Sequence, residues 1–378
     1  MKKVLAVILA GVMALTMFGC KKESNNTAAV SSTKADHSND VRSYLTGQWV
    51  SKEVNDKRPI AVMLSNTPDA PKQSGVGRAS VIYEAPGEGN YATRLMGIFE
   101  DWEDIEKMGS IRSCRTYYVY YMLEFDAIYV HAGQAAYALP TLEKEFVDNL
   151  STLRSEASKV FFQTDDRPRP HNTYTSGKGI KEGAEYMKYN LYHNSSYKEH
   201  YKFNTDDENM VTPDGGQTAM VVKPGYAVNK PWFVYDEEKG VYYRYQSEDK
   251  HIDAVTNEQL SVSNIIIQYS KIGNYDDTHY WNIDCTSGGK GKFITNGKAI
   301  DITWKKHSEF GITHYYDSKG KEITLNQGKT WVCIVDKEYT EKTEILSSKD
   351  DVDSKGNTVK KDDAKSSSSS SNTKKKNN

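Results

Sequence analysis

Residues 58–66 read Arg-Pro-Ile-Ala-Val-Met-Leu-Ser-Asn, a short apolar run that follows a proline and ends in polar residues. Five consecutive apolar side chains bounded in this way are typical of a strand that is buried on both faces. Residues 81–83, 95–99 and 127–130 repeat the pattern. The sequence therefore predicts a sheet of buried strands at the start of the folded body.

Segments with helical spacing alternate with these strands. Residues 116–125 carry Tyr, Val, Met and Leu side chains that would cover one side of the sheet as a helix. Residues 142–153 and 179–189 also have helical spacing. Strands mixed with helices predict layers of helix and sheet in this half of the chain.

The second half of the chain has a different pattern. Residues 205–217 are rich in Asp, Pro and Gly and form the expected boundary. Beyond them, helical spacing fades and turn signals recur. The strongest is Asn296-Gly297 between the apolar runs 293–295 and 299–303, because both residues tolerate a positive φ. This half is therefore expected to be rich in hairpins.

These patterns predict an α+β fold in two domains. The length of 378 residues exceeds the size at which a single hydrophobic core usually stops growing. We expect an N-terminal mixed α/β layered domain over residues 55–204 and a β-rich C-terminal domain over residues 218–340.

The N-terminus has the pattern of a secretory signal. Lys2 and Lys3 precede the apolar run 4–18, which ends at Gly19-Cys20. A small residue before a lone Cys is where bacterial lipoproteins are cleaved and lipidated, although Met17 stands where Leu is more usual.

We expect residues 1–19 to be a lipoprotein signal peptide. Cys20 would then carry a diacylglyceryl group and palmitate, which anchor the protein to the cell membrane on its extracytoplasmic side. The alternative is an ordinary secretory signal in which Cys20 is incidental.

Two polar segments flank the predicted body. Residues 20–54 have few large apolar side chains and predict a disordered tether. Residues 347–378 are rich in Ser and Lys and predict a disordered tail.

Composition excludes several classes of protein. With 37% hydrophobic residues and a formal net charge of −2, the chain is neither a polytopic membrane protein nor wholly disordered. Both predicted ends are basic, so the body is more acidic than the whole chain. An acidic body argues against nucleic acid as a partner, since that needs clustered Lys and Arg.

Cysteine usage excludes a disulfide scaffold. Besides Cys20, the chain has only Cys114, Cys285 and Cys333, without CxxC spacing. At most one disulfide can form among these three, and the sequence leaves their redox state open.

Sharp catalytic motifs are absent from the sequence. There is no HExxH, GxSxG or phosphate-loop motif and no Cys-rich metal spacing, so we expect no metal and no cofactor. Residues 287–291, Ser-Gly-Gly-Lys-Gly, offer backbone amides and a Lys to an anion, or form a tight turn between strands.

The densest polar grouping lies in the first half. Arg112 and Arg115 directly precede the predicted helix 116–125, whose free backbone amides would help to hold an anion. His131 follows a predicted strand, where α/β sheets tend to place ligand sites. Further candidates at or near strand ends and in loops are Glu84, Glu88, Arg94, His171 and Asn172.

Guanidinium groups bind carboxylates and phosphates bidentately, so this set of residues indicates a site for a carboxylated or phosphorylated ligand. A structural alternative remains open. Arg112 and Arg115 would then pair with Glu84, Glu88 or Asp126, and each His would be a hydrogen-bonded structural residue.

Two other residue types allow opposite interpretations. Cys114 lies between two arginines that would lower its pKa, whereas a buried thiol would be inert. The 26 tyrosines either include sugar-stacking platforms, as in the run 117–121, or are half-buried residues of strands and helices.

Seven motifs together resemble the YerB-like family of bacterial lipoproteins, in the same order along the chain. They lie at residues 58–66, 73–75, 82–84, 112–115, 124–133, 169–174 and 286–291.

The resemblance covers about residues 55–340 and implies an N-terminal α/β domain, a β-rich C-terminal domain and attachment by lipid. It implies no catalytic residues, because the family is a domain of unknown function. This chain departs from the family by one extra residue between Glu88 and Arg94, and by Cys114 where Ala is frequent.

Three functions fit the sequence. The first is a lipid-anchored protein that binds an anionic cell-envelope ligand, with Arg112 and Arg115 holding the anion and His131, His171 and Asn172 orienting it. The second is a hydrolase or transferase acting on cell-wall material, with Glu84 or Glu88 and His131 as acid and base. The third is an assembly module for a membrane protein complex.

Overall fold

The fold is built around one large mixed sheet. The computed structural model describes residues 36–70, 72–87, 89, 92–194, 197–276 and 279–359. Within that part of the chain, eleven strands form the central sheet. In spatial order they are β11 (Gln217–Thr218), β21 (Lys298–Lys306), β20 (Gly289–Thr295), β17 (Asn264–Ser270), β23 (Thr330–Asp336), β4 (Val81–Pro86), β5 (Thr93–Phe99), β3 (Ile60–Leu64), β7 (Ile128–His131) and β8 (Asn149–Ser151), with β22 (Thr313–Tyr316) paired to β21.

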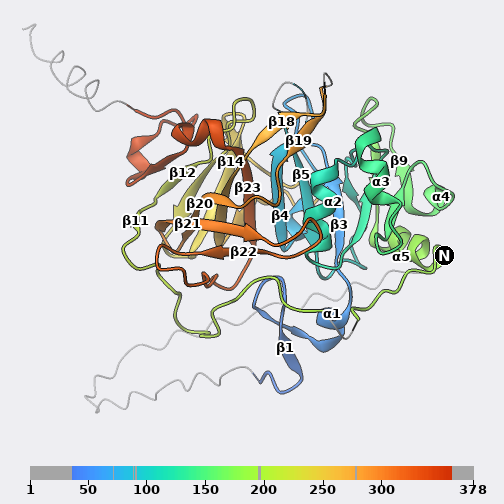
Figure 1. Cartoon of the computed structure of the whole chain (residues 1–378), viewed down its shortest axis with the longest axis horizontal. Helices are drawn as coiled ribbons and strands as arrows, with labels where there is room; N and C mark the ends of the chain where they lie inside the picture. The colour runs from blue at the N-terminus through green and yellow to red at the C-terminus, as the bar shows by residue number, and fades with distance from the viewer. Residues whose placement is uncertain are drawn as a thin grey trace, which may run out of the picture. The chain divides into compact units, whose positions relative to one another are not determined.

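Strands from both halves of the sequence share this sheet. β23 pairs in parallel with β4, with Trp331 opposite Ile82 and Cys333 opposite Glu84. β4 then pairs antiparallel with β5, and β3 pairs antiparallel with β5 and in parallel with β7. The sheet is therefore continuous from the C-terminal strands to the N-terminal ones (Figure 1).

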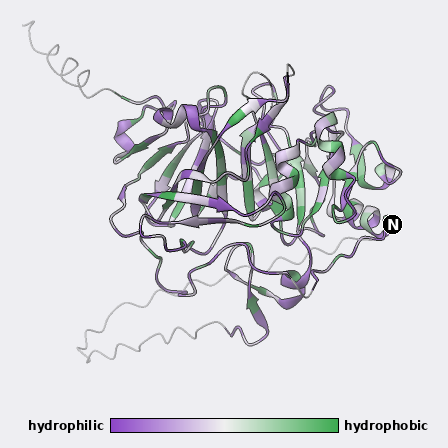
Figure 2. Ribbon diagram, viewed as in Figure 1, coloured by the Kyte–Doolittle hydropathy of each residue, from purple (hydrophilic) through white to green (hydrophobic). Residues whose placement is uncertain are grey.

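A second sheet packs on part of one face. Its strands are β15 (Asp249–Lys250), β14 (Val241–Gln246), β13 (Trp232–Asp236), β12 (Val221–Lys223) and β24 (Glu344–Leu346), with β16 (Ser261–Val262) paired to β14. Phe233 and Tyr242 of this sheet share a buried cluster with Ile265 and Trp331 of the central sheet. The interior strands are accordingly the most apolar part of the ribbon (Figure 2).

Short helices lie beside the sheets. They are α1 (Lys52–Asp56), α2 (Thr116–Leu123), α3 (Leu139–Leu142), α4 (Ala157–Val160) and α5 (Gly177–Tyr186), with short 3-10 helices η1 (Val76–Arg78), η2 (Ala136–Ala138), η3 (Lys337–Lys342) and η4 (Lys349–Asp351). α2 packs Tyr117, Tyr121 and Met122 on the face of the central sheet that carries Met63 and Met96. α5 contributes Ile180 and Ala184 to the opposite layer.

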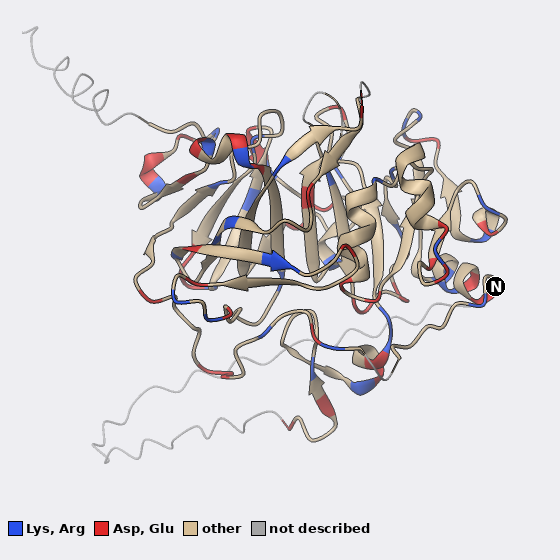
Figure 3. Ribbon diagram, viewed as in Figure 1, with Lys and Arg blue, Asp and Glu red and all other residues tan. Residues whose placement is uncertain are grey.

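Three small sheets complete the described structure. They are β1 (Asp40–Arg42) with β2 (Trp49–Ser51), β6 (Met108–Gly109) with β10 (Thr173–Thr175) and β9 (Phe161–Gln163), and β18 (Ile272–Asn274) with β19 (Trp281–Ile283). Charged residues concentrate in loops and on outer strands, while most strands of the central sheet carry few (Figure 3). Within the described residues, no helix combines the length and apolar composition needed to span a bilayer.

The expected α+β class is confirmed, and most predicted strands are present. The helix predicted over residues 142–153 is wrong. That segment holds only the end of α3, a turn and strand β8. Its apolar residues Leu142, Val147 and Leu150 are buried, so a turn followed by a strand satisfies the same hydrophobic spacing.

Both segments that were predicted to be disordered contain structured residues. Part of the tether, from residue 36, is structured, because Leu45 is buried and the backbone carbonyl of Thr46 accepts a hydrogen bond from Gly328 at 2.8 Å. Part of the tail, to residue 359, is also structured. Gly356 lies against the ring of Trp232, and Lys355 pairs with Glu248 at 2.8 Å.

Candidate functional site

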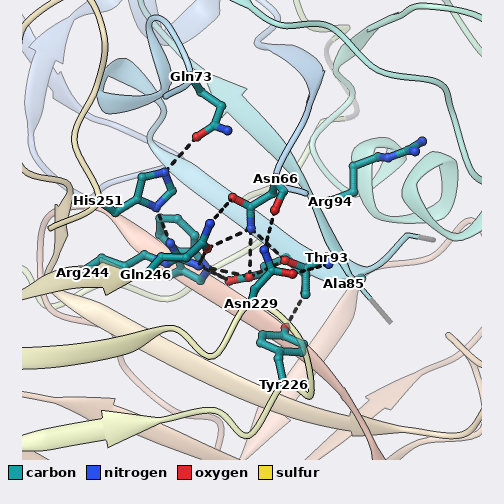
Figure 4. Close-up of polar contacts among 12 residues, drawn as sticks. Asn66, Gln73, Ala85, Thr93, Arg94, Tyr226, Asn229, Arg244, Gln246 and His251 are labelled. Atoms are coloured by element: carbon teal, nitrogen blue, oxygen red, sulfur yellow. Dashed lines mark hydrogen bonds and ion pairs between the residues drawn. The ribbon is translucent and has the colours of Figure 1, made fainter. Parts of the chain in front are cut away.

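The pairing of β4 with β5 separates two of the predicted site residues. Glu84 lies opposite Leu95, and Ala85 lies opposite Arg94. Because side chains alternate between the faces of a sheet, Glu84 and Arg94 project from opposite faces. Figure 4 shows Arg94 pointing away from the polar residues that surround Glu84. Glu84 and Arg94 therefore belong to two different polar clusters.

The first cluster surrounds the carboxylate of Glu84, which is fully buried. Arg244 Nη2 lies 2.9 Å from Oε2 and 3.1 Å from Oε1. Trp331 Nε1 donates to Oε2 at 3.0 Å, and the hydroxyl of Thr93 donates to Oε1 at 2.7 Å. Both carboxylate oxygens are thus engaged by the protein itself, which does not suit Glu84 to acid–base chemistry on a ligand.

Further polar side chains surround Arg244. Its Nη1 contacts Nδ1 of His251, whose Nε2 lies 2.8 Å from Oε1 of Gln73. Burial, together with the charge of Arg244, holds the pKa of His251 well below its usual range, so the imidazole is neutral. Asn229 donates to the carbonyl of Asn66 (Figure 4). This network ties residues 66–93 to residues 229–331 and has a structural role.

The second cluster contains three arginines, Arg94, Arg112 and Arg115, which we call the arginine cluster. Arg94 is the second residue of β5, and the other two lie in the loop between β6 and α2. Arg94 Nη1 donates to the carbonyl of Ser113 at 2.6 Å, so the strand and the loop are joined directly. Arg94 is 4% exposed and Arg115 is 8% exposed.

The loop that carries Arg112 and Arg115 is held by its backbone. Arg112 N donates to the carbonyl of Met63 at 2.9 Å, and Cys114 N donates to the carbonyl of Gly133 at 2.9 Å. Arg115 then serves as the N-cap residue of α2. The positions of these side chains are therefore fixed by β3, by the segment after β7 and by the start of α2.

The charges of the arginine cluster act on one another. Burial, followed by the charges of Arg115 and Arg112, lowers the pKa of Arg94 to about 9. Burial also lowers the pKa of Arg112, with Asp69 opposing the shift and Arg115 adding to it. Like charges that disfavour one another in this way gain free energy when an anion binds between them.

His171 and Asn172 lie beside Arg112. Arg112 Nη1 donates to the carbonyl of Pro170 at 3.4 Å, and His171 Nε2 lies 3.6 Å from the carboxylate of Asp69. Burial and the charge of Arg112 lower the pKa of His171. Asn172 is 8% exposed. The structure therefore brings Pro170 and His171 next to Arg112.

His131 has a different environment. Its side chain is fully buried, with Nδ1 2.8 Å from the carbonyl of Gly133 and Nε2 3.3 Å from Oδ1 of Asn149. Burial lowers the pKa of His131 to about 4. Both ring nitrogens face oxygen atoms inside the protein, and a neutral ring donates to one of them, so the ring is not offered to a ligand.

The remaining sequence candidates are Cys114, the segment 287–291, Glu88 and Cys20. Cys114 is buried, and burial raises the pKa of its thiol to about 12 against the opposing charges of Arg115 and Arg94. Cys285 and Cys333 are also free and buried. Residues 287–291 form the bend and first residues of β20, beside a hollow of about 500 Å³. Glu88 and Cys20 lie outside the described residues.

A buried carboxylate that sequence reasoning missed is Glu124, just after α2. Lys306 Nζ lies 2.6 Å from Oε1, Thr313 donates its backbone N–H to Oε2 at 3.0 Å, and His200 also contacts Oε2. Burial opposes ionisation, but the Lys306 charge and these hydrogen bonds lower the pKa of Glu124 to about 2. Its only sequence signal was its place at the start of the motif 124–133.

Metal binding has no support in the described residues. In that part of the chain, no group of three His, Cys, Asp or Glu side chains gathers as a metal ion would require.

Comparison with known proteins identifies the family. Residues 45–190 match the model described as "Protein of unknown function (DUF3048) N-terminal domain", and residues 220–332 match the corresponding C-terminal domain. The chain is 31% identical over 299 residues to the protein named "Putative lipoprotein YerB" of Bacillus subtilis (strain 168), covering 78% of this chain and 86% of that protein.

A solved structure agrees with this assignment. The crystal structure of the YerB protein from Bacillus subtilis superposes with a TM-score of 0.71 at 29% identity, and the match covers 81% of this chain and 99% of that one. The family resemblance inferred from the seven motifs is confirmed. The chain therefore belongs to the DUF3048 family of YerB-like proteins.

Proposed function

We propose that this protein is anchored to the extracytoplasmic face of the cell membrane by lipid on Cys20, and that it binds an anionic cell-envelope ligand at the arginine cluster. The observation that carries the proposal is the gathering of Arg94, Arg112 and Arg115, because the backbone carbonyl of Ser113, in the loop that carries Arg112 and Arg115, accepts a hydrogen bond from Arg94 Nη1 at 2.6 Å. Burial, followed by the charges of Arg115 and Arg112, lowers the pKa of Arg94 to about 9.

The anchor rests on the N-terminal sequence and on the relative. Residues 1–19 have the pattern of a lipoprotein signal, and Cys20 is the residue that such signals leave at the N-terminus. The relative that is 31% identical is named a putative lipoprotein. A single acyl chain binds membranes weakly, so stable attachment needs the diacylglyceryl group.

Two groups of ligands fit the arginine cluster. Carboxylates, such as those of peptidoglycan stem peptides, and phosphates, such as those of wall polymers, both accept paired hydrogen bonds from guanidinium groups. His171 and Asn172 would orient the ligand from the side of Arg112. His171 Nδ1 is buried and has no hydrogen-bond partner among the described residues, so a ligand that reached it would satisfy it.

The two matched segments support a proposal of two domains joined by the shared sheet, with the anion site built mainly by the N-terminal one. The enzymatic alternative loses support from Glu84 and His131, whose polar atoms are engaged internally. No observation within the described residues favours the assembly-module alternative.

A binding experiment tests the proposed site. The full-length protein in detergent would be titrated with soluble muropeptides as the carboxylated probe and with polyglycerol phosphate as the phosphorylated probe. We expect Arg112→Ala to weaken binding at least about tenfold, which corresponds to roughly 1.4 kcal/mol. Arg112→Lys should weaken it less, because the charge remains while the planar fork is lost.

The matched control is Arg78→Ala. Arg78 is an exposed arginine that pairs with Asp104 at 2.9 Å, away from the cluster. Its removal should leave the affinity unchanged. If neither probe binds the parent, or if Arg112→Ala binds as tightly as the parent, the proposal is wrong.

The anchor has a separate test. Mass spectrometry of the purified protein should find a mature chain that begins at an acylated Cys20, and Cys20→Ser should release the protein from the membrane fraction. An unmodified chain that retains residues 1–19 would contradict the lipid anchor without bearing on the anion site.

A further inference from the structure

Three tyrosines lie beside the arginine cluster. They are Tyr137 of η2 and Tyr275 and Tyr280, which flank the tip of the β18–β19 hairpin. The rings of Tyr137 and Tyr275 are stacked, with centroids 4.3 Å apart and planes 6° apart. The ring of Tyr280 meets that of Tyr137 edge-on at 6.0 Å. We call these three residues the tyrosine platform.

The platform contacts the arginine cluster at Arg115 and the start of α2 at Thr116. The guanidinium carbon of Arg115 lies 5.4 Å from the ring centroid of Tyr280, a cation–π contact. The side chain of Tyr275 hydrogen-bonds with that of Thr116, the first residue of α2 and the neighbour of Arg115 in the chain. The tyrosine platform therefore adjoins the arginine cluster at Arg115.

The platform is held in place by buried residues. Trp281 and Ile283 of β19 are buried in the layer that α2 also covers. Ala135 N, just before η2, donates to the carbonyl of Cys114 at 3.2 Å, which fixes Tyr137 relative to the arginine loop. The rings are thus positioned before any ligand arrives.

The rings are also accessible. Tyr280 is 39% exposed, and Tyr137 and Tyr275 are half-buried. By contrast, Tyr117, Tyr118 and Tyr121 of α2 are buried in the core. A sugar-stacking surface on the run 117–121 is therefore excluded for those three rings, whereas the platform presents accessible rings beside the arginine cluster.

We propose that the arginine cluster and the tyrosine platform form one site for an acidic saccharide, a sugar ring that carries a carboxylate or phosphate. This inference rests on the proposed function and names its ligand class. The apolar C–H face of a pyranose ring packs on exposed aromatic rings, which removes apolar surface from water. The ring's anionic substituent then reaches Arg115, whose guanidinium carbon lies 5.4 Å from the ring centroid of Tyr280.

The probes distinguish the contribution of the sugar ring to binding from that of the anionic group. N-acetylmuramic acid and N-acetylglucosamine share a ring, and only the first has a carboxylate. D-lactate has a carboxylate without a sugar ring. N-acetylglucosamine 6-phosphate and glycerol 3-phosphate form the corresponding phosphate pair. Calorimetric titration of the full-length protein with each probe at low salt would give five affinities. The two acid sugars are N-acetylmuramic acid and N-acetylglucosamine 6-phosphate, and the one that binds more tightly shows whether the site prefers a carboxylate or a phosphate.

We expect at least one acid sugar to bind about tenfold or more tightly than both the neutral sugar and its ringless anion. Tyr280→Ala should reduce that acid sugar to the affinity of the ringless anion and leave the ringless anion unchanged. Tyr280→Trp should restore binding, because the ring is replaced. Arg112→Ala should weaken both classes of anion.

The control is Tyr186→Ala, since Tyr186 is an exposed tyrosine with Lys159 5.3 Å from its ring centroid, on α5. It should bind all probes as the parent does. If ringless anions bind as tightly as acid sugars, if Tyr280→Ala binds acid sugars normally, or if uridine monophosphate outcompetes both acid sugars, the saccharide inference fails while anion binding stands. Failure of every anion to bind overturns both.

Discussion

Glu84 and Arg94 are one residue out of register across the β4–β5 hairpin, and their side chains leave the sheet on opposite faces. On one face, Glu84 enters a closed network with Arg244 and Trp331. On the other, Arg94 meets the loop that carries Arg112 and Arg115. One hairpin therefore supplies both an internal ion pair that joins the two halves of the sequence and part of the candidate ligand site.

The buried ion pair should dominate stability. Glu84→Ala leaves Arg244 buried without its countercharge, and removal of one partner from a buried pair typically costs about 3–5 kcal/mol of unfolding free energy. Urea denaturation would measure the loss. Arg78→Ala, which breaks exposed ion pairs, should cost at most about 1 kcal/mol. If Glu84→Ala lowered the unfolding free energy by no more than Arg78→Ala does, the Glu84–Arg244 pair would not be shielded from water as described.

Two buried glutamates, Glu124 and Glu100, should affect the unfolding free energy in opposite directions as the pH changes. The pKa of Glu124 is lowered to about 2, so its contribution is present above the unfolded value of about 4.3 and is lost as the pH falls toward 2. Burial raises the pKa of Glu100 to about 7, so its ionisation weakens the fold as the pH rises from about 4.3 to 7.

Urea unfolding from pH 2 to pH 8 tests both signs. Glu124→Gln should be less stable than the parent at neutral pH and lose the slope below about pH 4.3. Glu100→Gln should lose the slope between about pH 4.3 and 7. If Glu124→Gln or Glu100→Gln kept the parent's slope of unfolding free energy against pH, the environment described for that glutamate would be wrong.

The folded part of the C-terminal segment can be tested with two matched glycines. Gly356 has a φ of +80°, and an added Cβ would lie 2.6 Å from the Trp232 ring. Gly320 has a φ of +76° with no atom within 4 Å of such a Cβ. Both alanine variants pay for a left-handed backbone, about 1–2 kcal/mol. Gly356→Ala should lose roughly 1–3 kcal/mol more through overpacking. Equal losses in thermal unfolding would show that this segment does not pack on Trp232.

Local patterns made much of the fold predictable. The apolar run 60–64 and the Asn296-Gly297 turn specify β3 and the β20–β21 hairpin through residues that are neighbours in the chain. The pairing of β23 with β4 joins residues about 250 positions apart. Both strands are uniformly apolar, so neither encodes which strand lies beside it. The shared sheet therefore could not be predicted from periodicity.

The candidate site was predictable in part for the same reason. Arg112 and Arg115 are adjacent in sequence to a helix start, which drew attention to them. Glu84 was an equally plausible residue of the anion site, because sequence spacing does not tell which face of the sheet a strand residue occupies. Tyr275 and Tyr280 come from the other half of the chain, and only the tertiary fold brings them to Arg115.

The most direct test of the central claim is nuclear magnetic resonance of the full-length protein with 15N-labelled arginine. Inorganic phosphate would be added while the Nε–Hε signals are followed, with each signal assigned through its Arg→Lys variant. We predict that the signals of Arg94, Arg112 and Arg115 shift together along one saturable curve, while that of Arg78 stays constant. Shifts confined to other arginines, or no saturable shift in the cluster, would contradict the account.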